Sequence, residues 1–308
     1  QLGIQKWLGI PFAEPPINEL RWRAPIKTNN WKNLKEVNSF SPPCVQFQSS
    51  LTADGLVKPG DIIGSENCLY LNVYAPSSSK NKLQNNNELL PVMVWIHGGG
   101  NTTGMPSEYN PEIFVKTENI IVVSLSYRLG FFGWLSHPLI REQVGLNASS
   151  NFGLLDQIMA IQWVKNNIQF FGGDANNVTI FGESAGGQDV IALYTSPIAK
   201  GLFERAISQS GGTSVTNIKD AEKIDRYDDT LKNNYKYRHL TTEEWINILN
   251  KKGLINSEFE DKEVLSDLRS LGPKDLMNAI AKGEFWSEQR DLARIIGDDI
   301  VVPKEGIL

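Results

Sequence analysis

From about residue 90 onward, short apolar runs alternate with amphipathic stretches along the chain. The runs at 91–96 and 120–127 are almost continuously apolar, which is typical of parallel strands buried on both faces. The β-branched run at 177–181 predicts a third strand, and the segment 202–210 predicts a fourth. In the first ninety residues, which are rich in Pro and Trp, the stretch 68–76 predicts an edge strand of the same sheet.

Helical periodicity separates these predicted strands. Between the second and third strands, apolar residues recur at spacings of four and three and form one helix face, which Gly172 and Gly173 close. Its members are Leu154, Ile158, Ile161, Val164 and Ile168. A second helix, through 189–196, separates the third and fourth strands. Strands and helices in this order predict an α/β fold, with a central, mostly parallel sheet and helices on both faces.

Beyond residue 217 the pattern changes to charged, mainly helical segments. Thr241 and Glu244 stand at the spacing of a capping box, which predicts the start of a helix. We therefore expect one domain over residues 1–308, in which 217–308 form a mainly helical insertion region. The low-complexity stretch 77–88 predicts a solvated loop between two strands.

Composition excludes several classes of function. The 308 residues carry 30 basic and 35 acidic side chains, and a net charge of −5 is too mild to indicate a nucleic acid or an anionic membrane surface as partner, so we expect neither. No apolar run approaches the roughly 20 residues that span a bilayer. Three histidines without ligand-like spacing argue against a metal site. The two cysteines, Cys44 and Cys68, are compatible with one bridge or with two buried thiols.

The candidate chemistry begins with a serine between two glycines, Gly182-Glu183-Ser184-Ala185-Gly186. The G-x-S-x-G pattern alone is weak, but here it follows a predicted strand and opens a predicted helix, as a nucleophile elbow requires. The turn would lift the Ser184 hydroxyl clear of the sheet. The helix N-terminus would place the Ala185 N–H beside a reacting carbonyl.

A second motif, His97-Gly98-Gly99-Gly100, directly follows the strand predicted at 91–96. Three glycines can form a flexible turn, yet a turn after a buried strand seldom needs three residues without side chains. The alternative is a backbone surface whose N–H groups point at an oxyanion. Because both motifs lie at the ends of predicted strands, together they predict an acyl-transfer site.

Several long stretches resemble the type-B carboxylesterases, the family of cholinesterases and bacterial para-nitrobenzyl esterases. They are "GIPFAEPPINELRWRAP", "SENCLYLNVYAP", "VMVWIHGGG", "SYRLGFFGWLS", "NFGLLDQIMAIQWVKNNIQFFGGDANNVTIFGESAGG" and "KGLFERAISQSGG". The resemblance implies an α/β-hydrolase fold, Ser184 as the nucleophile, and an oxyanion hole from the N–H groups of Gly99, Gly100 and Ala185. It implies small-molecule ester substrates and no cofactor, and it leaves the oligomeric state open.

The same resemblance assigns supporting roles. It implies that Glu183, Ser210 and His97 surround the site without touching the reacting atoms, and Ser210 has packing as its alternative role. It also implies a disulfide and two buried ion pairs. These are Cys44 with Cys68, Arg21 with Glu66, and Arg128 with Asp156. A bridge would favour a secretory compartment, and reduced cysteines would favour the cytoplasm.

The triad of this family is incomplete in the sequence. In the family order the acid follows the serine by about 130 residues and the histidine by about 240, so both would lie beyond residue 308. Glu305 is too close to the preceding segment to be the acid. His97 is expected to orient the glycine loop, His137 to bound a loop and His239 to lie on the surface. We therefore expect a fragment that lacks the extreme N-terminus and the C-terminal part, with little turnover alone.

Three departures from the family pattern qualify the resemblance. Asp189, five positions after the nucleophile, stands where the family usually has a small residue. Two interpretations are open: it is a surface residue, or it alters the pocket. Asn101 follows the glycines where an aromatic or small apolar residue is common, which would make the acyl side more polar. No Trp lies between Cys44 and Cys68, which disfavours choline recognition.

Two other classes of function compete with the esterase. One is a non-catalytic cholinesterase-like adhesion module, which typically lacks the nucleophile. The other is a degenerate esterase that binds esters or lipids. Sequons at Asn101, Asn147 and Asn177 bear on function only in a secretory compartment, and modification of Asn101 would block the glycine loop.

Overall fold

The computed structural model of this chain describes residues 3–29, 31–48, 60–77, 89–222, 241–280 and 294–306. The loop predicted at 77–88 lies, apart from its first residue, outside the described residues. His239 also lies outside them.

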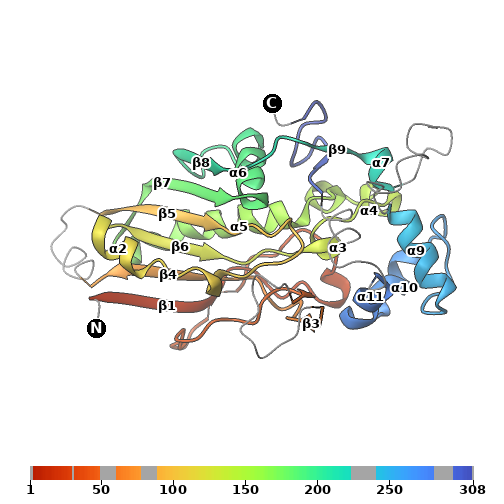
Figure 1. Ribbon diagram of the computed structural model, residues 1–308, viewed down its shortest axis with the longest axis horizontal. Helices are drawn as coiled ribbons and strands as arrows, with labels where there is room; N and C mark the ends of the chain where they lie inside the picture. The colour runs from red at the N-terminus through yellow and green to blue at the C-terminus, as the bar shows by residue number, and fades with distance from the viewer. Residues whose placement is uncertain are drawn as a thin grey trace.

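A six-stranded mixed sheet forms the centre of the molecule, in the order β1-β4-β6-β5-β7-β8 (Figure 1). The neighbours β6–β5, β5–β7 and β7–β8 are parallel, whereas β1–β4 and β4–β6 are antiparallel. The strands are β1 (Ile4–Pro11), β4 (Tyr70–Pro76), β5 (Leu90–Ile96), β6 (Ile121–Leu125), β7 (Gly173–Glu183) and β8 (Arg205–Gln209). The four parallel strands predicted from the apolar runs are therefore confirmed.

The prediction of 68–76 as an edge strand is wrong. Strand β4 lies between β1 and β6, and β1 forms the edge of the sheet. Sequence analysis missed β1 because its pattern is broken: Gly9 has a φ of +75°, and the pairing register with β4 shifts between Trp7 and Ile10. A bulge of this kind interrupts the two-residue alternation by which a strand is recognised.

Helices lie between the strands and beyond their ends. The α-helices are α2 (Glu112–Glu118), α3 (Gly130–Gly133), α4 (Pro138–Arg141), α5 (Phe152–Asn167), α6 (Ala185–Thr195), α7 (Ile218–Glu222), α9 (Thr242–Lys251), α10 (Val264–Ser270) and α11 (Pro273–Ile280). Short 3-10 turns occur at Asn18–Leu20 (η1), Pro106–Glu108 (η2), Gly145–Ala148 (η3) and Ile168–Phe171 (η4). Two small sheets pair β2 (Gln46–Phe47) with β3 (Ile62–Ile63), and β9 (Thr216–Asn217) with β10 (Ile296–Gly297).

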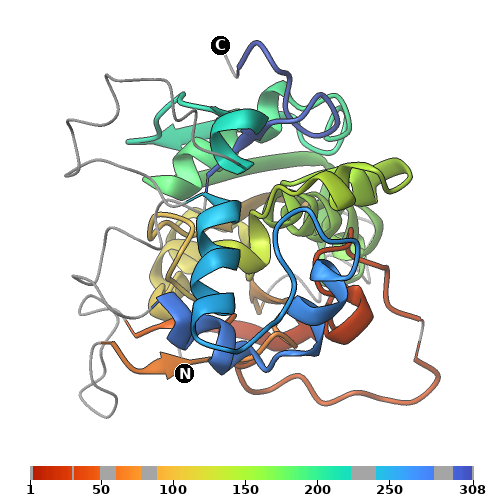
Figure 2. The same cartoon turned by 90° about the vertical axis from the view of Figure 1, so that its right-hand side faces the viewer.

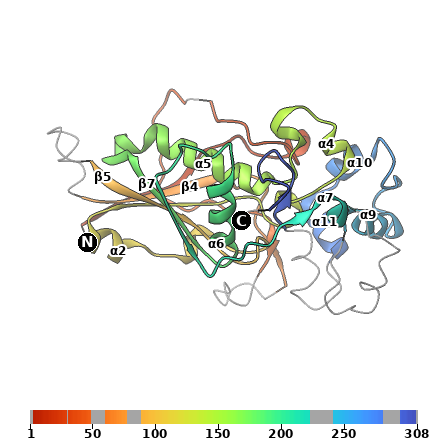
Figure 3. The ribbon, with the colours of Figure 1, turned by 90° about the horizontal axis from the view of Figure 1, so that it is seen from above.

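Both faces of the sheet are covered, as predicted. Helices α5 and α6 pack on one face, where Leu154, Val164 and Val190 join the large core cluster. Helix α2 covers the other face, where Val115 contributes to a smaller cluster. Figure 3 shows α2 and α5 on opposite sides of the strands. The apolar face predicted for α5 is buried except at Ile158, which is half-buried.

Helices α9, α10 and α11 lie beyond the carboxyl ends of the parallel strands, and Figure 2 looks onto this end of the molecule. Helix α9 begins with the predicted capping box: the Glu244 N–H donates to the Thr241 hydroxyl (3.3 Å), and the Thr241 N–H donates to the Glu244 carboxylate (3.2 Å). The boundary of a helical insertion at residue 217 stays a prediction.

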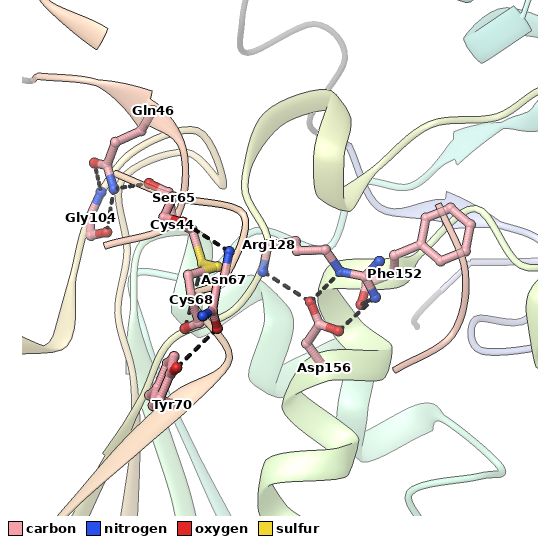
Figure 4. The surroundings of a disulfide bond; sticks show 10 residues. All are labelled: Cys44, Gln46, Ser65, Asn67, Cys68, Tyr70, Gly104, Arg128, Phe152 and Asp156. Carbon is pink, nitrogen blue, oxygen red and sulfur yellow. Dashed lines mark hydrogen bonds and ion pairs between the residues drawn. A yellow bond between two sulfur atoms is a disulfide. The ribbon is translucent and has the colours of Figure 1, made fainter. Parts of the chain in front are cut away.

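Two buried ion pairs and a disulfide fix the loops around the sheet, and all three were implied by the family resemblance. Arg21 donates two hydrogen bonds to Glu66, at 2.6 and 2.7 Å. Arg128 donates to both oxygens of Asp156, at 2.7 Å each. Figure 4 shows this pair beside the disulfide of Cys44 and Cys68, whose Cα atoms are 4.9 Å apart.

Candidate active site

Ser184 occupies a tight turn between the last residue of β7 and the first residue of α6. Its backbone has φ +57° and ψ −119°, a combination that costs conformational energy for a residue with a side chain. The turn is held from both sides, since the Ser184 N–H donates to the Gln209 carbonyl on β8 (2.8 Å) and the Ser184 carbonyl accepts from the Gln188 N–H (2.9 Å). Ser184 itself is exposed.

Glycines make this turn possible because the backbones of β5 and α6 nearly touch. A Cβ on Gly186 would lie 2.2 Å from the carbonyl oxygen of Ile96, and a Cβ on Gly182 would lie 2.5 Å from the carbonyl oxygen of Gly186. Neither distance is compatible with a side chain. The two flanking glycines therefore bring the N-terminus of α6 against the end of β5, where the second motif begins.

The second motif forms a compact loop, residues 97–104, which we call the glycine loop. Gly99 and Gly100 have φ angles of +102° and +64°, and the N–H groups of Thr102 and Thr103 both donate to the Gly99 carbonyl (3.1 Å each). A Cβ on Gly98 would lie 3.3 Å from the Cβ of Ser184. The loop is thus in contact with the serine turn.

Three backbone N–H groups in the glycine loop and at the start of α6 are candidates for binding an oxyanion. Within the described part of the chain, the N–H groups of Gly99 and Gly100 donate to no protein acceptor. Ala185 is the first residue of α6, so its N–H has no partner within the helix. Such groups at a helix N-terminus and in a glycine turn suit a developing negative charge. Their role in an oxyanion hole stays a prediction.

His97 braces the glycine loop from inside. Its ring is buried, its Nδ1 lies 2.9 Å from the Gly98 carbonyl, and it stacks on Tyr127 with ring centroids 4.4 Å apart. Burial lowers the pKa of His97 to about 4, although the hydrogen bond to Gly98 opposes this shift. The imidazole is therefore neutral at physiological pH and is engaged within the loop.

The far end of the glycine loop is clamped by Gln46, a fully buried residue that sequence analysis missed (Figure 4). Its side-chain oxygen accepts from the Gly104 N–H (2.8 Å) and the Thr103 hydroxyl (2.7 Å). Its amide nitrogen donates to the Gly104 and Cys44 carbonyls, at 3.0 Å each. The disulfide segment and the glycine loop are thereby joined through one side chain.

Replacing Gln46 with leucine is expected to lower the free energy of unfolding by about 2–3 kcal/mol. Leucine has a similar volume but leaves the Gly104 N–H, the Gly104 carbonyl and the Thr103 hydroxyl without their buried partner. Chemical denaturation measures the loss. Gln162→Leu is the control, because Gln162 bonds Asn166 on the surface of α5. Equal stability of the two variants would contradict the clamp.

A buried polar network lies behind the glycine loop. The Asn101 amide donates to the Asp189 carboxylate (3.1 Å), and the Gln157 amide on α5 donates to its other oxygen (2.6 Å). The Tyr127 hydroxyl donates to the His97 carbonyl (2.7 Å) and approaches the Asn101 side-chain oxygen (3.2 Å). Asp189 is fully buried, so its interpretation as a surface residue is wrong.

Asn101 is also turned inward. It is 3% exposed, and its amide is used by Asp189 and Tyr127 rather than presented to an acyl group. The expected gain in polarity on the acyl side therefore does not follow from its position. Asn101 also begins one of the sequons, and its burial places the side-chain amide of that sequon inside the fold. Asn147 and Asn177 are half-buried, and their side-chain oxygens accept from the Ala24 N–H and from Arg205.

Glu183 and Ser210 lie at the ends of neighbouring strands next to the serine turn. Glu183 is exposed at the end of β7, and a Cβ on Gly98 would lie 3.3 Å from its carboxylate. Ser210 follows β8 and is exposed, with a φ of +54°. The structure brings both close to Ser184 in the fold, and their supporting roles stay predictions.

The two described histidines are both engaged away from the serine. His137 caps α4 by accepting from the Leu139 N–H (3.2 Å), and its Nε2 lies 2.9 Å from the Phe259 carbonyl. Glu305 is exposed in the last described segment. In the segments that the structure describes, Ser184 therefore has a glycine loop and a helix N-terminus beside it, without a histidine in contact.

None of the helices in the described segments combines the length and apolar character that a membrane span requires. The same segments hold no group of three or more His, Cys, Asp or Glu side chains that could bind a metal ion.

Comparison with known proteins gives consistent results. The sequence model described as "Carboxylesterase family" matches residues 1–268. The chain is 44% identical over 214 residues to the para-nitrobenzyl esterase of Bacillus subtilis, which covers 68% of this chain and 41% of that protein. It is 42% identical over 214 residues to the medium-chain fatty acyl-CoA hydrolase precursor of Anas platyrhynchos, covering 68% and 36%.

Solved structures extend the similarity to the whole chain. A PNB esterase structure superposes with a TM-score of 0.73 and 32% sequence identity, covering 100% of this chain and 56% of that one. A thermophilic PNB esterase superposes with a TM-score of 0.75 at the same identity and coverage. The chain therefore spans about half the length of these structures, and 36–41% of the two curated relatives.

Proposed function

Because this chain belongs to the carboxylesterase family, we propose that it carries the nucleophile and oxyanion hole of a serine hydrolase that acts on carboxylic esters. The α/β-hydrolase fold and the type-B carboxylesterase resemblance predicted from the sequence are both confirmed. Relatives named as esterases and hydrolases favour this function over a non-catalytic adhesion module.

One observation carries the proposal. Ser184 stands in a strained turn at the N-terminus of α6, and the glycine loop packs against it so closely that a Cβ on Gly98 would lie 3.3 Å from the Ser184 Cβ. An ester carbonyl attacked at Ser184 would place its oxygen between the helix N-terminus and the glycine loop. Backbone N–H groups fixed in advance at such a position stabilise the transition state more than the ground state.

The proposed reaction has two steps. The Ser184 oxygen attacks the carbonyl carbon, its proton passes to a general base, and the N–H groups of Gly99, Gly100 and Ala185 stabilise the tetrahedral oxyanion. The C–O bond to the alcohol then breaks, the alcohol leaves with a proton, and an acyl-serine remains. Water hydrolyses the acyl-serine by the same route. We assign the general base to a histidine outside the described residues, since both described histidines are engaged elsewhere.

Hydrolysis of a para-nitrophenyl ester tests this proposal against its alternatives. The longest natural polypeptide that contains this chain should release para-nitrophenolate from para-nitrophenyl butyrate catalytically, and one burst equivalent should accompany acylation. A degenerate esterase would instead bind the ester at equilibrium and release it unchanged. Saturable binding without any product, from folded protein, would overturn the proposed hydrolysis.

A further inference from the structure

Helix α6 carries a buried carboxylate, Asp189, that no cation in the described part of the chain neutralises. Both hydrogen bonds to Asp189 come from neutral amides, those of Asn101 and Gln157. Asp156, the fully buried carboxylate on α5, receives a bidentate ion pair from Arg128 instead. Burial raises the pKa of Asp189 to about 7, with partial opposition from the bonds to Gln157 and Asn101. A helix that served packing alone would not retain such a group, because an apolar residue costs less to bury.

The position of Asp189 connects two parts of the site. It stands on α6, five residues after Ser184, and its partner Asn101 directly follows Gly99 and Gly100. Asn101 has a φ of +58°, in the left-handed region that Asn adopts more readily than most residues other than Gly. Its carbonyl also accepts from the Gly130 N–H, at 2.7 Å.

Tyr127 completes the connection on the other side of the glycines. Its hydroxyl donates to the carbonyl of His97, the residue before them, and approaches the side chain of Asn101, the residue after them. The segment from 97 to 101 is therefore held at both ends by one buried network. Any loss of the Asn101 anchor would free the three glycines between these points, whose backbone has no side chains to fix it.

We propose that Asp189 is a positioning residue for the ester hydrolysis inferred above: through Asn101 it fixes Gly99 and Gly100 so that their N–H groups face the carbonyl at Ser184. This inference rests on the proposed function. Two side chains thus hold different parts of the same loop. Gln46 holds the far end at Gly104, and Asp189 holds Asn101, next to the glycines.

The neighbouring titratable groups do not share this role. Burial, and then the charge of Asp189, raise the pKa of Tyr127 well above its ordinary value, so the hydroxyl stays protonated. His97 is neutral because burial lowers its pKa to about 4. Burial raises the pKa of Glu108, on η2, to about 7, and its charge acts on Tyr109. Variants of Asp189 leave all of these groups in place.

Three variants separate positioning from stability. Asp189→Ala removes the anchor and leaves the Asn101 amide without an acceptor. Asp189→Asn keeps an acceptor for Asn101. Its new N–H₂ faces Gln157, whose amide must rotate by 180° so that its side-chain oxygen, which is buried and has no partner among the described residues, accepts the hydrogen bond. Ala192→Gly, later on the same helix and also fully buried, destabilises α6 without touching the loop.

The experiment measures ester hydrolysis and deuterium uptake of the glycine loop in the longest natural polypeptide that contains this chain. Asp189→Ala should reduce kcat by about 10- to 100-fold with little change in KM, as misplaced oxyanion donors do. Uptake at Thr102 and Thr103 should accelerate roughly tenfold. Asp189→Asn should restore both values to within about threefold of the natural protein, and Ala192→Gly should leave the loop unchanged.

Two results would overturn the inference. If the glycine loop takes up deuterium at the same rate in Asp189→Ala as in the natural protein, Asp189 does not hold the loop. Equal losses of kcat in Asp189→Ala and Ala192→Gly would reduce its role to stability. If the natural protein hydrolyses no ester while loop uptake still rises in Asp189→Ala, the proposed hydrolysis fails and the anchoring of the loop stands.

Discussion

Replacing Ser184 with alanine is expected to reduce ester hydrolysis by at least about four orders of magnitude in kcat. The substitution removes the hydroxyl that would attack the ester carbonyl, so no acyl-serine can form. The backbone N–H groups of the loop and of Ala185 remain, and KM should change little. Initial rates with para-nitrophenyl butyrate, measured on the longest natural polypeptide that contains this chain, give both constants.

Ser270→Ala is the matched control for this prediction. Ser270 caps the end of α10 by donating to the Asp267 carbonyl (2.6 Å), and it is exposed. Its removal should leave kcat unchanged. Hydrolysis that persists in Ser184→Ala at the natural rate would place the nucleophile elsewhere and contradict the assignment of the turn.

Removing Arg128 is expected to destabilise the fold by about 3–5 kcal/mol. Asp156 is fully buried on α5, and Arg128 donates to both of its oxygens and also holds the Arg23 carbonyl (2.9 Å). Burial raises the pKa of Asp156, and Arg128 opposes this shift. Arg128→Met leaves a carboxylate in the core without its cation, and urea denaturation at neutral pH measures the loss.

Two further variants make this prediction specific. Lys6→Met breaks the ion pair with Glu112 (2.9 Å), in which the lysine is 45% exposed, and should cost less than 1 kcal/mol. The double variant Arg128→Met with Asp156→Leu removes both buried charges and should recover much of the lost stability. A loss in Arg128→Met no larger than that in Lys6→Met would show that the buried pair does not stabilise the fold.

Elements with a strong local signal were predicted correctly from the sequence. These signals are the apolar runs of β5 and β6 and the periodic face of α5. Each depends on residues close together in the chain, so it can be recognised without knowledge of the tertiary contacts. The capping box of α9 is likewise complete within four residues. The disulfide and the two ion pairs followed from the family resemblance, because their partners are far apart in sequence.

Other features could not be predicted because they exist only through tertiary contacts. The inner position of β4 depends on β1, whose alternation is broken at Gly9. Gln46 carries no motif of its own, and its only sequence signal was its place two residues after Cys44. Its function as a clamp arises when the disulfide segment folds against Gly104.

Asn101 and Asp189 show the same limit at the site. In the sequence they were two separate departures from the family pattern, 88 positions apart. In the structure they are hydrogen-bonded partners, so one polar side chain accounts for the other. Sequence spacing gave no reason to connect them, since the contact depends on the crossing of the glycine loop and α6.

The most direct test of the central claim is intact-mass analysis after reaction with a fluorophosphonate, which forms an oxygen–phosphorus bond with an activated serine and releases fluoride. The longest natural polypeptide that contains this chain should gain one adduct, on the peptide that contains Ser184, and Ser184→Ala should gain none. An adduct that persists in Ser184→Ala, or no adduct on folded protein that includes a histidine base, would contradict Ser184 as the nucleophile of this esterase.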